Sequence, residues 1–193
     1  ARICPCAGQR FMSDIVLDWS RRHLTTYDDL PNFILSASHE VHDTMARQVL
    51  TLDRNLQQYV QWFIETKIER DENSVLVLMA DHGIHYGPIF ANEKQARWEH
   101  ENPLMLVVAP NRLVTDTLLS NRDKLVTLKD MHMTIRDWAS FPVRSTLDGV
   151  RPDAKSLLYD SLPSDRSCED VQSHPSFSTS CHSPRRRRPQ QQS

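Results

Sequence analysis

Glycine, long apolar runs and an excess of charge of one sign are all scarce in this sequence. The 193 residues include only 4 glycines, which argues against the repeated tight turns of an all-β meander. The longest apolar run has the length of a strand, so we expect no membrane span. The formal net charge of −2 gives no electrostatic reason to expect a nucleic-acid partner. An apolar content of 39% and a charged content of 25% are typical of a globular domain with a hydrophobic core.

The two ends of the sequence give little information about the fold. Residue 1 is Ala and no signal peptide follows it, so we expect a processed or partial chain in which a missing targeting segment proves little. Near the other end, Arg185 to Arg188 lie beside proline and glutamine, a composition typical of a solvated, disordered tail. A nuclear-localisation signal or a site for an acidic partner is the alternative for this basic block.

The four cysteines favour disulfides over a zinc knuckle. Cys4 and Cys6 are too close in sequence to form an ordinary disulfide with each other, so each would pair elsewhere. Cys168 and Cys181 flank a serine-rich segment, and we predict that they pair. An even number of cysteines without a C-x-x-C motif is typical of secreted proteins.

The spacing of apolar residues predicts alternating helices and strands. Apolar residues at three- and four-residue steps predict four helices, over 11–26, 44–69, 115–125 and 127–141, with Thr115 as an N-cap. Short apolar runs predict three buried strands, over 32–38, 75–80 and 103–110. Residues 82–102 are polar and aperiodic, which predicts a loop.

The order strand, long helix, strand predicts a βαβ unit with parallel strands. Apolar strands separated by helices imply an α/β fold, in which helices cover a partly parallel sheet. In such sheets, ligands bind beyond the carboxyl ends of the strands. Asp81 and His82 follow one predicted strand, whereas His39, His42 and Asp43 follow another. We therefore expect both groups to face one crevice.

Asp81 and His82 are candidate metal ligands because carboxylate oxygen and imidazole nitrogen both bind zinc. We expect Gly83 to supply the backbone angles that turn both side chains inward. His42 and Asp43 are candidates for further ligands or for holding a substrate oxyanion. The alternative is an Asx turn followed by a helix cap, with no metal.

Other polar and sulfur-containing side chains have simpler interpretations. His39, taken alone, is typical of a polar residue at a helix entrance, and His132 of a half-exposed histidine on a helix. Met131 and Met133 are predicted to fill the core. The segment that contains Glu99 and His100 is predicted to be a solvated loop near the mouth of the crevice.

The string VLVLMADHGIHYG at 75–87 resembles the late metal-binding motif of the alkaline phosphatase and sulfatase superfamily. Further segments are similar to one uncharacterised, mostly animal branch of it, domain of unknown function 229. They occur in the order of that branch and are SASHEVHD at 36–43, WEHENPLMLVVAP at 98–110, LVTLKDMHMTIRDW at 125–138 and SLLYDSLPSDRSCED at 156–170.

The resemblance implies an alkaline-phosphatase-like fold, a divalent metal ion such as zinc, and hydrolysis or transfer of phosphate or sulfate esters. Asp81 and His82 match metal-ligand positions, and His42 matches a site histidine. His85 stands where the branch has arginine, and His100 replaces the second of two glutamates. His39 and His85 are additional candidate site residues.

The superfamily's nucleophile and an early acidic ligand precede the part of the fold that this sequence resembles, and no catalytic nucleophile is identified here. We therefore interpret residues 1–163 as the carboxyl-terminal part of an incomplete α/β domain, with the amino-terminal half missing, and 164–193 as a tail. The resemblance and the predicted Cys168–Cys181 disulfide favour the secretory pathway, with an extracellular or membrane-anchored protein.

Three hypotheses follow. The first is a fragment of a metal-dependent phosphoesterase, sulfatase or related transferase. The second is a non-catalytic relative or truncated gene product that serves binding or interaction only. The absent nucleophile and the changes at His85 and His100 favour it. The third is a structural domain without metal, which two groups of site-like residues at strand ends argue against.

Overall fold

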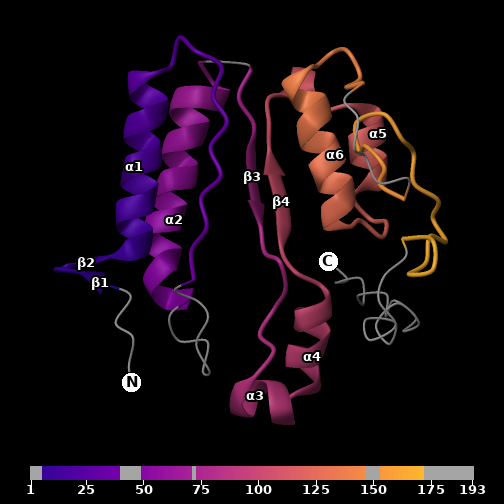
Figure 1. Ribbon diagram of the computed structural model, residues 1–193, viewed down its shortest axis with the longest axis horizontal. Helices are drawn as coiled ribbons and strands as arrows, with labels where there is room; N and C mark the ends of the chain where they lie inside the picture. Colours follow the sequence, from indigo (N-terminus) through magenta and orange to yellow (C-terminus); the bar gives the residue numbers. More distant parts are fainter. Residues whose placement is uncertain (1–5, 40–48, 71–72, 147–152, 172–193) are drawn as a thin grey trace, which may run out of the picture. The chain divides into compact units, whose positions relative to one another are not determined.

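The structure combines helices with short strands and is therefore mixed α/β (Figure 1). It is a computed structural model that describes residues 6–39, 49–70, 73–146 and 153–171. Contacts divide the chain into two compact units, Ala1–Pro110 and Asn111–Ser193. The predicted division at residue 163 stays a prediction. In the described part of the chain, no helix combines the length and apolarity that a membrane crossing requires.

The first unit opens with a short hairpin and two helices. Strands β1 (Cys6–Ala7) and β2 (Arg10–Phe11) are antiparallel, and Gly8 has a φ of 64° in the turn between them, a conformation that favours glycine. Helix α1 spans Met12–Thr26, and α2 spans Val49–Phe63 and continues into the π-helical turn η1 (Ile64–Ile68). The helix predicted over 11–26 is confirmed, and the one over 44–69 is confirmed from Val49 onward.

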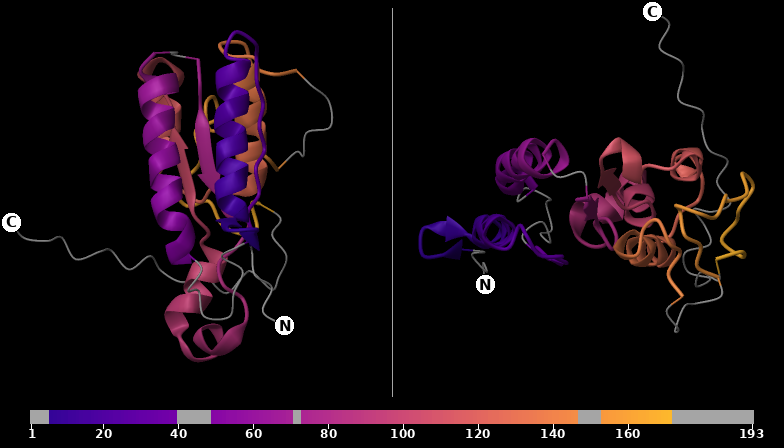
Figure 2. Two further views of the ribbon diagram at one scale, coloured as in Figure 1. Left: turned by 90° about the vertical axis from the view of Figure 1, so that its left-hand side faces the viewer. Right: turned by 90° about the horizontal axis from the view of Figure 1, so that it is seen from above.

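Helices α1 and α2 lie side by side (Figure 2) and are joined by polar and aromatic contacts. Tyr59 and Phe63 of α2 are buried. The hydroxyl groups of Ser20 and Tyr59 are 2.7 Å apart, in a buried hydrogen bond between the helices. The guanidinium of Arg21 lies 5.1 Å from the centre of the Trp62 ring. The amphipathic pattern of both sequences thus gives a helix pair with a shared interior.

A two-stranded sheet follows the helix pair in this unit. Strands β3 (Leu76–Met79) and β4 (Met105–Val108) confirm the strands predicted at 75–80 and 103–110. They are antiparallel, with Leu76 opposite Val108 and Met79 opposite Met105. The pairing continues one step further, because the Ala80 N–H donates to the Leu104 carbonyl at 3.0 Å.

The predicted strand at 32–38 is wrong, and the βαβ unit that depended on it is not formed. The backbone there is not part of any sheet in the described residues, and Phe33 and Leu35 are 75% and 80% exposed. An apolar run becomes a strand only where another strand pairs with it. The partly parallel sheet is likewise absent from the described residues, where both strand pairs are antiparallel.

The loop predicted at 82–102 is also wrong over most of its length. Helices α3 (Gly87–Asn92) and α4 (Lys94–Glu101) fill it, at the end of the sheet where β3 finishes and β4 begins (Figure 1). Pro88 lies in the first turn of α3, where its missing N–H costs nothing. These two helices reverse the chain, which is why β4 runs antiparallel to β3.

The second unit contains η2 (Asn111–Leu113), α5 (Asp116–Asn121) and α6 (Leu128–Ala139). The Thr115 hydroxyl accepts from the Leu118 N–H, which confirms the predicted N-cap. Thr127 and Asp130 form a capping box at the start of α6, where each side chain accepts from the other's backbone N–H. The helices predicted over 115–125 and 127–141 are confirmed with shorter bounds.

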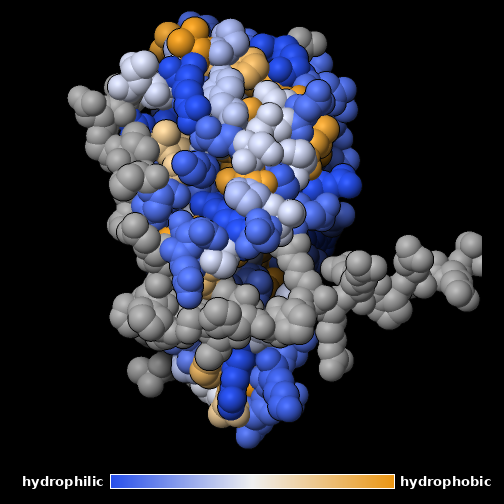
Figure 3. Space-filling view, turned by 90° about the vertical axis from the view of Figure 1, so that its right-hand side faces the viewer, coloured by the Kyte–Doolittle hydropathy of each residue, from blue (hydrophilic) through white to orange (hydrophobic). Residues whose placement is uncertain are grey.

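Residues 153–171 pack against α5 and α6 to form the core of this unit. The buried Asn121 side chain donates to the Asp160 carbonyl and accepts from the Leu162 N–H. Met131 and Met133 are buried, as predicted. The other buried apolar residues in the described part of this unit are Leu113, Leu157, Leu158, Leu162, Cys168 and Val171. Polar residues dominate the face seen in Figure 3, where apolar ones are scattered.

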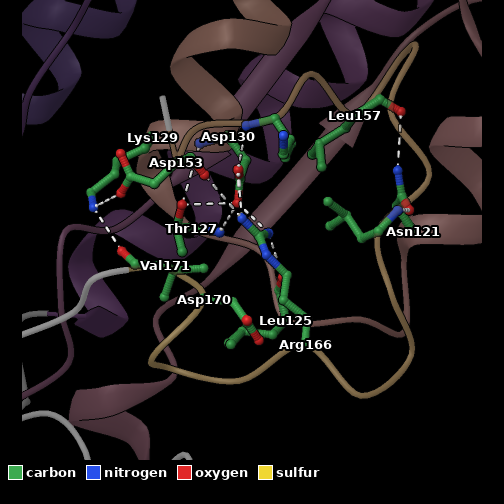
Figure 4. A network of polar contacts seen from close by, with 12 residues as sticks. Asn121, Leu125, Thr127, Lys129, Asp130, Asp153, Leu157, Arg166, Asp170 and Val171 are labelled. Carbon is green, nitrogen blue, oxygen red and sulfur yellow. Dashed lines mark hydrogen bonds and ion pairs between the residues drawn. The ribbon is translucent and has the colours of Figure 1, made fainter. Parts of the chain in front are cut away.

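A buried ion pair fixes the last described segment to α6 (Figure 4). Both oxygens of Asp130 contact the guanidinium of Arg166, at 2.8 and 3.1 Å. The Lys155 N–H also donates to Asp130, and Lys129 forms an ion pair with Asp153. Burial raises the pKa of Asp130, but hydrogen bonds from Arg166 and from backbone N–H groups outweigh it, so this pKa lies below its ordinary value.

Candidate metal centre

The candidate site lies in the loop that follows β3, where the chain delivers Asp81 and His82. Backbone bonds hold this loop against the approach to β4. Just beyond the bond from Ala80 to Leu104, the Gly83 N–H donates to the His100 carbonyl at 3.2 Å. Asp81 and His82 thus lie between two backbone hydrogen bonds that join their loop to the segment before β4.

Gly83 is required here by close packing and not by its backbone angles. A Cβ atom at this position would lie 2.5 Å from the Glu99 carbonyl oxygen and 2.7 Å from the His100 nitrogen. The glycines with positive φ among the described residues are Gly8 and Gly87. The predicted reason for this glycine is therefore wrong, because what matters is the close approach of the loop to the end of α4.

Asp81 and His82 interact directly with each other. The Asp81 Oδ1 accepts from the His82 backbone N–H at 3.0 Å, and its Oδ2 lies 3.6 Å from His82 Nε2. The Asp81 side chain is 83% exposed and that of His82 is 36% exposed. Burial raises the pKa of Asp81, but hydrogen bonds from the backbone N–H groups of His82 and Asp81, together with the nearby imidazoles of His82 and His39, outweigh it and hold the pKa below its ordinary value. Asp81 is therefore an accessible carboxylate.

Three histidine rings form a cluster beside this carboxylate. The ring of His82 lies 4.7 Å from that of His85 and 5.3 Å from that of His100, and His85 and His100 are 6.0 Å apart. Phe90 of α3 packs edge-on against His100 at 5.6 Å. The Nδ1 atoms of His82 and His100 lie 2.7 and 3.2 Å from one carbonyl oxygen, that of Gly83. The cluster therefore combines the end of α4 with the loop after β3.

The structure brings together three of the residues nominated from the sequence. These are Asp81, His82 and His85. For His39 the structure gives an electrostatic effect on the pKa of Asp81. His42 and Asp43 lie outside the described residues, as does Cys181. His132 is exposed on α6 in the second unit, as expected for a surface histidine.

Sequence reasoning missed His100 as a member of the cluster. Its segment was interpreted as a solvated loop, whereas it is the last turn of α4. One signal in the sequence could have pointed to it, because His100 stands where the branch that this sequence resembles has glutamate.

The donor atoms present do not make a complete metal site. Among the described residues, no group of three or more His, Cys, Asp or Glu side chains is arranged to hold an ion. Two open hollows of about 480 and 640 Å³ lie elsewhere, one along α2 and the other beside Arg166. Any further ligand would come from side-chain movement in the cluster or from residues outside the described ranges.

Among the described residues, Cys168 is a cysteine that forms a disulfide. It is buried and disulfide-bonded, and its partner's side chain lies outside the described residues. This agrees with a disulfide at Cys168, while Cys181 as its partner stays a prediction.

Comparison with known proteins gives one match. No curated protein and no solved structure matches the chain significantly. The sequence profile of one family, described as Protein of unknown function (DUF229), matches residues 2–192. This range is nearly the whole chain, and the protein therefore belongs to the DUF229 family.

Proposed function

We propose that Asp81 and His82 bind a divalent metal ion, with zinc as the first candidate, in a hydrolase or transferase that acts on phosphate or sulfate esters. The distance between Asp81 Oδ2 and His82 Nε2 carries this proposal, at 3.6 Å. Two atoms that each lie about 2.0–2.1 Å from a tetrahedral zinc ion are about 3.3 Å apart. The two donors thus need only a small adjustment to share one ion.

The protonation states of both side chains favour the same role. The lowered pKa of Asp81 keeps its carboxylate charged, which is the form that binds a cation. The Gly83 carbonyl can only accept a hydrogen bond, so the Nδ1 of His82 must carry the proton. In the neutral form of the ring, which is the form that binds a metal ion, Nε2 then has a lone pair, and Nε2 is the nitrogen that faces Asp81. Hydrogen bonding of the remote ring nitrogen is the usual way in which proteins orient a metal-bound histidine.

A metal ion bound here would polarise an ester oxygen or lower the pKa of a bound water or hydroxyl group. The chain's own residues would hold the ion and keep the site open to solvent, since most of the Asp81 side chain is exposed. His42 and Asp43 are proposed as further ligands or as contacts for the substrate oxyanion. No nucleophile is identified in this chain, so the proposal assigns it part of a catalytic site.

The wider assignment rests on the resemblance of five ordered segments to the alkaline phosphatase and sulfatase superfamily. On this proposal the chain is the carboxyl-terminal part of such an α/β domain, and it acts together with an amino-terminal half. The disulfide at Cys168 supports a secretory, extracellular or membrane-anchored location, because disulfides persist in oxidising compartments.

Isothermal titration calorimetry with zinc and with cobalt tests the metal proposal. We expect Asp81→Asn and His82→Ala each to weaken binding by at least about tenfold, since the first removes the negative charge of the ligand and the second removes the imidazole nitrogen. Matched controls are Asp123→Asn and His132→Ala, whose exposed side chains lie in the second unit. Equal affinity in the wild type and in the two site variants would refute the proposed site.

A non-catalytic relative is the second candidate. It is favoured by the absence of an identified nucleophile and by the incomplete set of metal donors among the described residues. Assays of the complete protein with p-nitrophenyl phosphate and p-nitrophenyl sulfate separate the candidates. Hydrolysis that Asp81→Asn abolishes supports the enzyme, whereas metal binding without hydrolysis supports the non-catalytic relative.

A further inference from the structure

The residue at the end of α4, His100, contacts the candidate site in a way that the resemblance does not explain. We propose that His100 is a positioning residue, which fixes the Gly83 peptide and through it the ring of His82. The proposal rests on the proposed function in so far as it concerns a metal site at Asp81 and His82. It assigns His100 no direct contact with the ion.

The backbone and the side chain of His100 both form hydrogen bonds with Gly83. The His100 carbonyl accepts from the Gly83 N–H at 3.2 Å, and the His100 Nδ1 lies 3.2 Å from the Gly83 carbonyl oxygen. Gly83 is thereby bound to His100 through both of its backbone polar groups. The absence of a Cβ at Gly83 lets the two chain segments come this close.

The Gly83 carbonyl is shared by two imidazoles. His82 donates to it from Nδ1 at 2.7 Å, and His100 approaches the same oxygen at 3.2 Å. Because a carbonyl oxygen has two lone pairs and donates nothing, both nitrogens act as donors. A carbonyl held by two donors has less freedom to rotate than one held by a single donor. His100 thus restricts the peptide group that sets the tautomer and direction of His82.

The ring of His100 is itself held in place. It packs at 5.3 Å from the ring of His82 and is contacted edge-on by Phe90 from α3. The two short helices after β3 therefore hold the ring of His100 in position, since α4 carries His100 and α3 carries Phe90. A glutamate at this position would present carboxylate oxygens, which cannot donate to a carbonyl. The exchange of glutamate for histidine accordingly creates a donor.

The choice of substitutions separates a positioning role from direct ligation. The Nδ2 of asparagine occupies nearly the place of histidine Nδ1, whereas the Nε2 of glutamine occupies nearly that of histidine Nε2. His100→Asn therefore keeps the donor to Gly83, and His100→Gln keeps only the remote nitrogen. We expect zinc affinity to fall about 10- to 100-fold in His100→Ala, to recover largely in His100→Asn, and to remain weak in His100→Gln. Recovery in His100→Gln but not in His100→Asn would overturn the positioning role.

A second readout needs no metal. Nitrogen-15 NMR of the imidazoles reports which nitrogen of His82 carries the proton. We expect the Nδ1–H tautomer in the wild type and in His100→Asn, and a mixture of tautomers in His100→Ala. A thermal melt of each variant checks that it is folded. If the His82 tautomer is the same in all variants, the inference is wrong. If the tautomer responds but the wild type binds neither zinc nor cobalt, the proposed function fails and the positioning role stands.

Discussion

Two aspartates of this protein, Asp81 and Asp130, have lowered pKa values for different physical reasons. The Asp130 side chain has no exposed surface, whereas that of Asp81 is 83% exposed. Asp130 accepts three hydrogen bonds at Oδ2 and two at Oδ1, from Thr127, Lys155 and Arg166. Among the described residues, the hydrogen bonds that lower the pKa of Asp81 are local, from the adjacent His82 N–H and from its own backbone N–H.

The difference shows what each carboxylate is available to do. An ionised carboxylate has about four lone-pair positions, and those of Asp130 are all in use. Asp130 therefore joins α6 to the segment that contains Arg166 and has no capacity left for a ligand. Asp81 retains acceptor capacity on an accessible oxygen, next to an imidazole nitrogen. A lowered pKa alone would not distinguish these two cases, but the count of partners does.

The largest expected effect comes from breaking the buried pair. Arg166→Met leaves the Asp130 charge buried without its cation, so we expect unfolding of the second unit to become easier by about 3–5 kcal/mol. Urea denaturation, followed by circular dichroism, measures this change.

Two matched variants sharpen the result. Arg166→Lys retains the charge but not the two parallel hydrogen bonds, so it should cost less than Arg166→Met. Arg122 pairs with Asp123 on the surface, where both side chains are at least 75% exposed, and Arg122→Met should cost less than about 1 kcal/mol. If Arg122→Met and Arg166→Met cost the same, burial is not what gives the Asp130 pair its strength.

The local parts of the fold could be predicted from the sequence. Helices α1, α5 and α6 and strands β3 and β4 were predicted because their apolar spacing and caps are encoded within each segment. Pairing of strands is not encoded in this way. The run at 32–38 has strand composition, but no strand in the described part of the chain pairs with it. The direction of β4 depends on how α3 and α4 turn the chain.

Residues of the candidate site were predicted correctly where the element that carries them was predicted correctly. Asp81 and His82 follow an apolar run that does form a strand, so their position at a strand end was correct. The imidazole of His39 contributes to the lowered pKa of Asp81, although the strand expected before it is absent. His100 was missed because α4 was missed, and its neighbours in the cluster are 15 or more positions away in the sequence. Contacts at such separations depend on tertiary structure.

A smaller effect is expected at the exposed site, from Gly83→Ala. The added Cβ would meet backbone atoms of Glu99 and His100, which cannot move as a side-chain end can. We expect a loss of about 1–3 kcal/mol in stability, typical of overpacking, together with weaker zinc binding. Urea denaturation and calorimetry measure the two effects.

Gly8→Ala is the matched control for that substitution. Gly8 has a positive φ but no atom within 4 Å of an added Cβ, so its cost is backbone strain in the hairpin. Zinc affinity should be unchanged by Gly8→Ala. Equal zinc affinity in the two alanine variants would mean that the close packing of Gly83 against the end of α4 does not support the site.

The smallest effect concerns the acid limit of stability. A carboxylate whose folded-state pKa lies below its unfolded value of about 3.9 stabilises the fold above that pH, and this contribution is lost as the pH falls through the folded-state pKa. The Thr127 hydroxyl donates to Asp130 at 2.8 Å and is one cause of its lowered pKa. Thr127→Ala should therefore raise the pKa of Asp130 towards its ordinary value and move acid unfolding to higher pH. It should also cost about 1 kcal/mol near neutral pH through loss of the N-cap.

Thr127→Ser and Asp81→Asn complete this test of the two aspartates. Serine keeps the hydroxyl group, so Thr127→Ser should restore both the neutral stability and the acid limit. Asp81→Asn should leave the acid limit unchanged, because an exposed carboxylate with a lowered pKa contributes little stability once solvent screens it. A shift of acid unfolding in Asp81→Asn as large as that in Thr127→Ala would show that the Asp81 loop stabilises the fold. Asp81 would then share the structural role of Asp130, and the contrast that identifies it as a binding group would be lost.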